Sequence, residues 1–190
     1  MGVKGVKATG SNALRGGRPL EARVEVTSQA SPDAVYATLA DLRTHLEWAG
    51  SRASKTARML TMEAPAGAAT VGIEFFSTGS DPMGVFADQS VVTEAVPGRV
   101  FEFVTEARQV PKRGGEPVEW TLVHRYEIAP HDDGSRISYT VRITRVSRLP
   151  GMLKLFGTRL AWIGMRMSAS IAKRSLGNLS AVAQERSETG

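Results

Sequence analysis

The stretch PGMLKLFGTRLAWIGMRMSASIAKRSLGNLSAVAQ, residues 150–184, decides the fold. Proline lacks a backbone N–H, so Pro150 suits the first turn of a helix. Large apolar residues then recur at spacings of three and four, which places them on one helix face. They are Leu149, Leu153, Phe156, Leu160, Ile163, Met167 and Ile171. At 1.5 Å per residue this helix spans roughly 52 Å. A bend or end is predicted at Gly177 and Asn178, because both residue types tolerate left-handed backbone.

The first folded residues upstream predict one strand and a pair of short helices. Residues 21–27 alternate charged and small apolar side chains, as a half-buried strand does. Ser31, Pro32 and Asp33 then supply an N-cap, a first-turn proline and an acid at the positive end of the helix dipole. The helical period continues to about Arg43, and a second short turn holds Trp48.

The next hundred residues have an extended pattern broken by turn signals. Six strands are predicted, at residues 54–62, 69–78, 85–95, 100–106, 118–129 and 135–146. Their short links favour an antiparallel meander, because parallel pairs need crossovers of about a dozen residues or more. Seven twisted strands and one long helix predict an α+β, helix-grip fold, in which a curved antiparallel sheet wraps around the C-terminal helix. We expect a disordered leader at 1–20, one ligand-binding domain at 21–184 and a tail at 185–190.

Composition and charge narrow the function classes. The chain has 190 residues and no cysteine, which excludes disulfides and thiolate metal sites. Residues 19–133 hold 10 Lys or Arg against 17 Asp or Glu, whereas residues 134–184 hold nine bases and no acid. Two interpretations stay open: the two halves neutralise each other across the fold, or the basic half forms a surface for anionic lipid or an acidic partner.

Three segments resemble a known superfamily. The run EVTSQASPDAVYATLADLRTHLEWAG (residues 25–50) is similar to the N-terminal signature of the START and pollen-allergen superfamily (SRPBCC), which includes a polyketide cyclase/dehydrase-like branch. The segments VPGRVFEFV (96–104) and HDDGSRISYTVRI (131–143) resemble its central and final strands. The resemblance covers residues 21–184 and implies a ligand cavity between sheet and helix. Relatives include lipid carriers, polyketide cyclases and aromatases, and coenzyme Q-binding proteins, and no motif selects one branch.

Alternation along the strands predicts which side chains enter the cavity, since one face of each strand must look toward the helix. In residues 69–78 the set with Val71, Ile73 and Phe75 is preferred inward over Glu74 and Phe76. Apolar walls with a few polar groups are typical of small-molecule sites. The predicted lining comprises Phe75, Phe101, Phe103, Trp120, Leu122, His124, Tyr126, Tyr139 and Val141 from the strands, and Phe156, Leu160, Ile163 and Met167 from the helix.

Catalysis is a second hypothesis for the same residues. A histidine titrates in the range useful for acid–base work, and a neighbouring tyrosine helps to enolise a carbonyl. His124, Tyr126 and Tyr139 are therefore the catalytic candidates for a polyketide cyclase, aromatase or dehydratase. No zinc spacing occurs among the histidines, and phosphate-binding glycine loops are absent. We expect no metal and no cofactor.

The predicted long helix has a second face of interest. Leu155, Arg159, Trp162, Arg166 and Lys173 cluster about 110° from its apolar stripe. Bases around Trp and Leu are typical of surfaces that dock on lipid headgroups, and the alternative is a solvated face that touches a homodimer partner or loop. The absence of cysteine fits a cytoplasmic protein, and the lipid-docking interpretation adds a position at the periphery of a membrane. Its preferred function is binding or carriage of a hydrophobic small molecule (a lipid, quinone or polyketide-like compound), without nucleic acid.

Overall fold

The computed structural model describes residues 20–50, 52, 57–147 and 151–189, and for residues 20 and 151–168 it describes the backbone alone. The chain begins with strand β1 (Leu20–Ser28), helix α1 (Pro32–Ala40), the 3₁₀ turn η1 (Leu42–Thr44) and the π-helical turn η2 (Leu46–Gly50). Six strands follow: β2 (Arg58–Glu63), β3 (Glu74–Ser80), β4 (Gly84–Val96), β5 (Val100–Pro111), β6 (Val118–His131) and β7 (Gly134–Val146). Helix α2 (Gly151–Thr189) completes the order. The expected leader at 1–19 lies outside the described residues.

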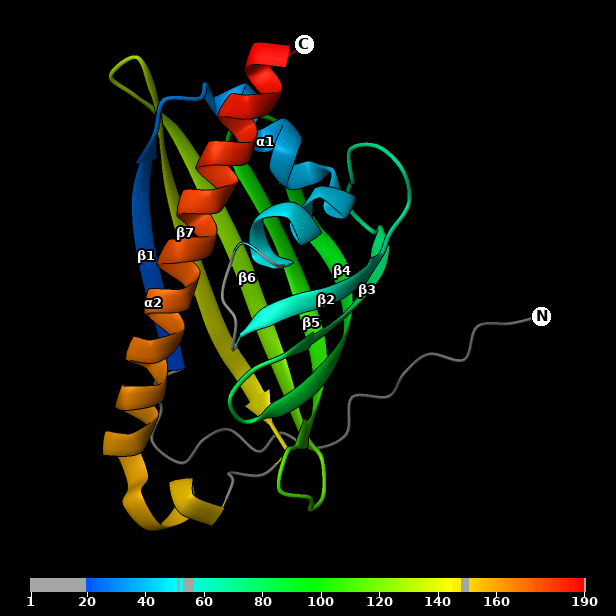
Figure 1. Ribbon diagram of the computed structural model, residues 1–190, viewed down its shortest axis with the longest axis vertical. Coiled ribbons are helices and arrows are strands. Elements are labelled where there is room, and N and C mark those ends of the chain that lie inside the picture. The colour runs from blue at the N-terminus through cyan, green and yellow to red at the C-terminus, as the bar shows by residue number, and fades with distance from the viewer. Residues whose placement is uncertain (1–19, 51, 53–56, 148–150, 190) are drawn as a thin grey trace, which may run out of the picture.

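The strands form one antiparallel seven-stranded sheet in the order β1-β7-β6-β5-β4-β3-β2. Strands β2 to β7 pair with their sequence neighbours, and β1 joins the far side by pairing with β7, where Val24 lies opposite Tyr139. The sheet curves, and α1 and α2 lie on its concave side (Figure 1). The predicted α+β, helix-grip fold is confirmed.

Helix α1 begins where the sequence predicts it. The Ser31 hydroxyl accepts a hydrogen bond from the Ala34 N–H at 3.3 Å, and Pro32 occupies the first turn. Both features satisfy or remove backbone donors that have no partner inside the helix. Val35 and Leu39 are fully buried one turn apart. The capped end and the apolar face thus fix α1 against the sheet.

Helix α2 does not end or bend at Gly177 and Asn178, where the sequence predicted it to. It continues through Gly177 and Asn178 to Thr189, across most of the residues expected as a tail, and its marked bend lies near its N-terminal end (Figure 1). The Asn178 amide donates to the Trp48 carbonyl oxygen at 3.0 Å, and Leu176 and Leu179 on either side of it are buried. This tertiary packing outweighs the local preference for a helix end.

The described core contacts of α2 come from its C-terminal half. Leu176, Leu179, Val182 and Ala183 are buried, whereas Ile171 of the predicted apolar stripe is half-buried. The side chains of Leu153, Phe156, Leu160, Ile163 and Met167 lie outside the description. The helical period therefore continues about three turns beyond the stripe that the sequence analysis emphasised.

One strand start differs from expectation in a way that bears on the site. Strand β3 begins at Glu74 rather than at residue 69, because the chain turns at Gly72, whose φ of +89° suits glycine. Val71 is consequently 61% exposed, so its predicted inward position is wrong. Phe75 is buried and Phe76 is 46% exposed, as the alternation predicted.

Candidate ligand-binding site

The sheet register arranges the predicted lining into cross-strand rows on the concave face. One row joins Val92, Phe103, His124, Val141 and Ala22, and the next joins Phe101, Tyr126, Tyr139 and Val24. In an antiparallel sheet such opposed side chains lie within contact distance of each other. The polar tips of the lining are thereby concentrated at β6 and β7.

His124 and Tyr139 form the central polar pair. The Tyr139 hydroxyl lies 2.7 Å from Nδ1 of His124. The imidazole stacks on Phe103 with ring centroids 4.7 Å apart, and Tyr126 packs on Tyr139 at 4.6 Å. A hydrogen bond on one ring nitrogen and an aromatic ring on one face hold the imidazole in a single orientation. Its Nε2 has no hydrogen-bond partner among the described residues.

Burial keeps these groups neutral. Desolvation and, to a smaller extent, the nearby His45 lower the pKa of His124 to about 4. Desolvation also raises the pKa of the Tyr126 and Tyr139 hydroxyls above their ordinary value. In the neutral tautomer that carries its proton on Nε2, Nδ1 of His124 accepts a hydrogen bond from the Tyr139 hydroxyl. In that tautomer an N–H donor at Nε2 is directed away from the tyrosine.

Trp48 adds a donor that the sequence analysis did not assign to the site. It lies in η2, where the π-helical turn and the bond from Asn178 position it, and its ring meets Tyr126 edge-on at 6.4 Å. The side chain is 3% exposed, and its indole Nε1 is buried without a hydrogen-bond partner among the residues that the structure describes. Buried indole N–H groups normally have a partner, so this N–H is a donor that remains available to an acceptor. π-Helical turns occur frequently at functional sites.

His45 packs on Trp48 and helps to position it. Its Nε2–H donates to the Leu39 carbonyl oxygen at 2.8 Å, and its ring packs on Trp48 at 4.6 Å. Burial lowers the pKa of His45 to about 4. Its bonded nitrogen and packing give it a positioning role for Trp48. The sequence predicted no role for His45, because its contact with Trp48 has no signature in the pattern of residues.

The strand residues of the predicted lining all lie on the concave face. Phe75, Phe101, Phe103 and Tyr126 are buried, and Trp120, Leu122, His124, Tyr139 and Val141 are half-buried. The structure therefore brings the strand residues together, and their contact with a ligand stays a prediction. The helix residues Phe156, Leu160, Ile163 and Met167 have side chains outside the description.

The predicted basic surface of α2 is described only at Lys173, which is exposed. Leu155, Arg159, Trp162 and Arg166 lie where only the backbone is described, so lipid or partner docking stays a prediction. The bases of β7 behave differently. Arg136, Arg142 and Arg145 pair with acids on neighbouring strands at 3.0–4.0 Å: Glu25, Glu21, and Glu106 and Glu119, respectively. Over β7, at least, the acidic and basic parts of the chain neutralise each other.

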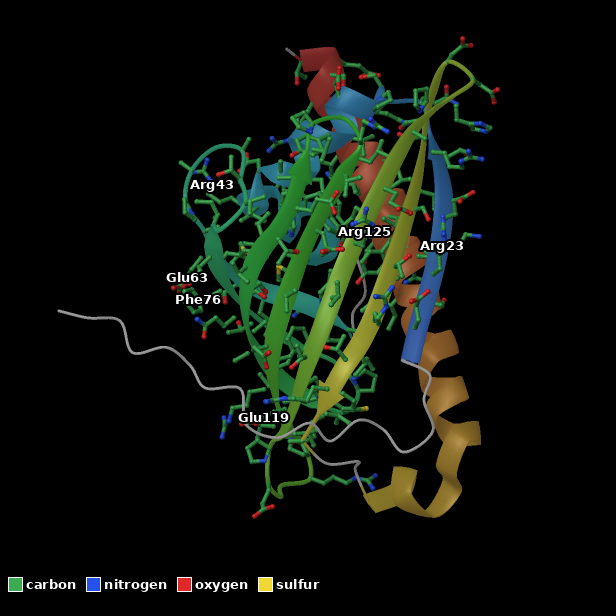
Figure 2. All side chains as sticks on the ribbon, turned by 180° about the vertical axis from the view of Figure 1, so that it is seen from behind. Arg23, Arg43, Glu63, Phe76, Glu119 and Arg125 are labelled. Carbon is green, nitrogen blue, oxygen red and sulfur yellow. The ribbon has the colours of Figure 1, made fainter. Side chains whose placement is uncertain are left out.

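The outer face of the sheet carries ion pairs and a shallow groove. Figure 2 shows this face, with Arg125 near its middle and Glu63 and Phe76 toward one side. Arg125 contacts Glu94 at 2.6 Å, Glu102 at 3.0 Å and Glu127 at 3.2 Å. The groove, of about 300 Å³, lies over β2 to β5 between residues such as Phe76 and Arg108, away from the aromatic cluster.

The described residues contain no cluster of three or more His, Asp or Glu side chains placed to hold a metal ion. No described helix combines the length and the apolar character needed to cross a membrane.

The fold and the inward side chains together define a helix-grip protein with an aromatic concave face. No protein-family model matches the chain, and no curated protein matches it. Solved structures do share the fold. The protein TTHA0849 from Thermus thermophilus is 14% identical, with a TM-score of 0.64, over 88% of this chain and 99% of that one.

Two further structures extend this likeness. An uncharacterised protein from Rhizobium leguminosarum is 12% identical, with a TM-score of 0.61, over 88% of this chain and 96% of that one. DynU16, a protein of the dynemicin biosynthetic locus, is 14% identical, with a TM-score of 0.54, over 86% of this chain and 47% of that one. At such identities the likeness shows the fold.

Proposed function

We propose that this chain is a START-like (SRPBCC) protein that binds or carries a hydrophobic small molecule on the concave face, and that the molecule presents a carbonyl or similar acceptor to Trp48. The observation that carries the proposal is the buried indole N–H of Trp48, which has no partner in the described part of the chain and whose ring meets Tyr126 edge-on. The fold and the signature segments support the family assignment.

The surroundings of Trp48 favour a neutral, aromatic or alicyclic ligand. The ring centroid of Tyr126 lies 6.3 Å from that of Phe103 and 4.6 Å from that of Tyr139. His124 is neutral at physiological pH, so the polar groups here offer hydrogen bonds and no net charge. A ketone or quinone oxygen among aromatic rings satisfies the donor without the desolvation cost of a charged ligand. The locus of DynU16 motivates including polyketide-like compounds in the ligand set.

Binding fits these groups better than acid–base catalysis. A general base works best when its pKa lies near the operating pH, and that of His124 is lowered to about 4. The tyrosine hydroxyls, whose pKa is raised, are correspondingly poor acids. The cyclase or dehydratase hypothesis therefore requires a substrate that raises the pKa of His124 on binding.

The test compares two rigid probes that differ only in the acceptor: an acetylbiphenyl and the ethylbiphenyl of the same shape. We expect the ketone to bind more tightly, by about fivefold for one neutral hydrogen bond. Trp48→Phe keeps an aromatic ring and removes the N–H, so it should abolish the difference between the probes. Isothermal titration calorimetry measures each affinity.

Tyr36→Phe is the matched control, because Tyr36 lies in α1 and meets Phe101 rather than Trp48. It should leave the difference between the probes unchanged. Equal affinity of the two probes for the wild-type protein would overturn the assignment of Trp48. Failure of both probes to bind, together with native mass spectra free of any copurified small molecule, would overturn the binding function.

A further inference from the structure

Asp88 is an acid on the concave face, away from the aromatic cluster. It lies in β4 and pairs with Ser77 of β3 and Ala107 of β5, and Ala107 pairs in turn with Trp120 of β6. Ser90, two residues along β4, is buried on the same face and bonds Thr105 at 2.9 Å. Alternation therefore places the Asp88 carboxyl inward.

The Asp88 carboxyl has no hydrogen bond or ion pair to another described residue. Its Oδ1 is buried there without a partner, and desolvation raises the pKa of Asp88 to about 7. The side chains that face it from β3, β5 and β6, namely Ser77, Ala107 and Trp120, carry no charge. A carboxyl that is buried without a partner costs stability.

Asp81, seven residues earlier, shows what a structural aspartate looks like in this chain. Its Oδ1 accepts hydrogen bonds from the N–H groups of Met83 and Gly84 at 2.7 and 2.8 Å, and its Oδ2 accepts from the Gln109 amide at 2.8 Å. Asp81 fixes the β3–β4 turn. Asp88 has no comparable task within the fold.

The sheet register gives the separation between Asp88 and the aromatic cluster. Phe103, which pairs with His124, and Ala107, which pairs with Asp88, lie four residues apart along β5. At about 3.3 Å per residue these rows are roughly 13 Å apart. The row between them joins Ser90, Thr105 and Leu122, and its two hydroxyls are bonded to each other. The concave face thus has the Asp88 carboxyl and the His124 imidazole separated by one row in which the two hydroxyls already partner each other.

We propose that Asp88 accepts a hydrogen bond from a hydroxyl or amine at the far end of the same ligand whose acceptor meets Trp48. This inference rests on the proposed function and narrows the ligand class to elongated hydrophobic molecules with a carbonyl at one end and a donor at the other. An inward carboxyl oxygen without a partner selects a donor, since a second acceptor there would be repelled.

The test adds one group to the acetylbiphenyl probe, a hydroxyl at the far end of the second ring. At pH 8, where the Asp88 carboxyl is ionised, we expect this hydroxyl to tighten binding by about five- to tenfold. Asp88→Leu should remove the gain. Gln89→Leu, on the exposed outer face of the same strand, should retain it and is the matched control.

The outcomes separate this inference from the proposed function. If the acetylbiphenyl binds the wild-type protein equally well with and without the added hydroxyl, the role of Asp88 is overturned while the Trp48 site stands. The same holds if Asp88→Leu keeps the gain in affinity from the hydroxyl. If neither probe binds, both proposals are overturned. Should Asp88→Leu fail to fold, Asp88→Asn preserves shape and one acceptor oxygen. It should then reduce the gain without abolishing it, and an undiminished gain would contradict the role of the carboxylate.

Discussion

The Tyr139 hydroxyl lies 2.7 Å from Nδ1 of His124, and this bond joins β7 to β6 at the centre of the concave face. It holds the imidazole against Phe103 and leaves Nε2 without a hydrogen-bond partner among the described residues. Two residues fifteen positions apart therefore act as one unit in orienting the site. The same pair is the most direct place to test the electrostatics of the interior.

Tyr139→Phe should release the His124 ring. Without the hydroxyl, Nδ1 loses its only hydrogen bond among the described residues, and we expect the imidazole to exchange between tautomers. Nitrogen-detected NMR of the two proteins measures the tautomer directly. One tautomer in the wild type and a mixture in the variant is the expected result, and a mixture in both would contradict the proposed geometry.

Acid should destabilise the fold through its two buried histidines. The pKa of His45 and of His124 is lowered from 6.5 to about 4, so between these values the unfolded chain binds more protons than the native one. The contribution of the two neutral histidines to the free energy of unfolding is therefore fully present above about pH 6.5 and falls as the pH drops toward 4. The loss is at most on the order of 3 kcal/mol per histidine.

Urea unfolding at pH 7.5 and pH 4.5 measures this loss. His124→Phe removes one titrating group and retains an aromatic ring beside Phe103, so its stability should depend less steeply on pH than that of the wild type. An identical pH dependence in the two proteins would show that His124 titrates normally in the native state.

Asp88→Asn should stabilise the protein, and more at high pH than at low pH. The pKa of Asp88 is raised from 3.8 to about 7, so its neutral form is favoured in the fold. Stability from this group is full below pH 3.8 and is lost as the pH rises through 7. Removing the charge should therefore add about 1–3 kcal/mol at pH 8 and little at pH 4.

The control for Asp88 is Asp81→Asn, which should destabilise the protein at pH 8. The Asp81 carboxylate accepts three hydrogen bonds, and an amide accepts them through one oxygen only. Thermal unfolding at both pH values compares the two variants. Equal effects of the two substitutions would contradict the contrast between a partnered and an unpartnered aspartate.

Truncating the C-terminal core of α2 should cost more than breaking the outer-face ion pairs. Leu179 is fully buried, so Leu179→Ala should lose about 2–5 kcal/mol. Arg125→Ala breaks contacts with three glutamates, but these side chains are 22–44% exposed, and we expect a loss of about 1 kcal/mol. Denaturant unfolding gives both values, and the reverse order would show that the charge network dominates.

Much of the fold followed from local patterns. The Ser31–Pro32 cap, the turn signals and the alternation in β5 and β6 depend on a residue and its near neighbours, so α1 and the inward set with Phe103, His124 and Tyr126 were predictable. Val71 was misplaced because Gly72 turns the chain before β3 begins. A period of two does not reveal where a strand starts.

The site was only partly predictable for a related reason. Trp48 and Asp88 became candidates because one polar atom of each, Nε1 of Trp48 and Oδ1 of Asp88, is buried without a partner among the described residues. Such a condition depends on every element packed around an atom, and no spacing along the chain encodes it. The continuation of α2 through Gly177 depends likewise on Leu176 and Leu179 being buried against other elements.

The amino-acid sequence by itself determined the order of strands and helices along the chain, the absence of cysteine chemistry and the inward set of β5 and β6, because periodicity and capping are properties of neighbouring residues. The tertiary structure alone decided that Tyr139 bonds His124, that the Trp48 ring meets Tyr126 edge-on, and that Asp88 has no partner within the described structure. These relationships join residues from separate strands and turns. They arise only when the sheet closes its register and desolvates the groups between its strands and helices.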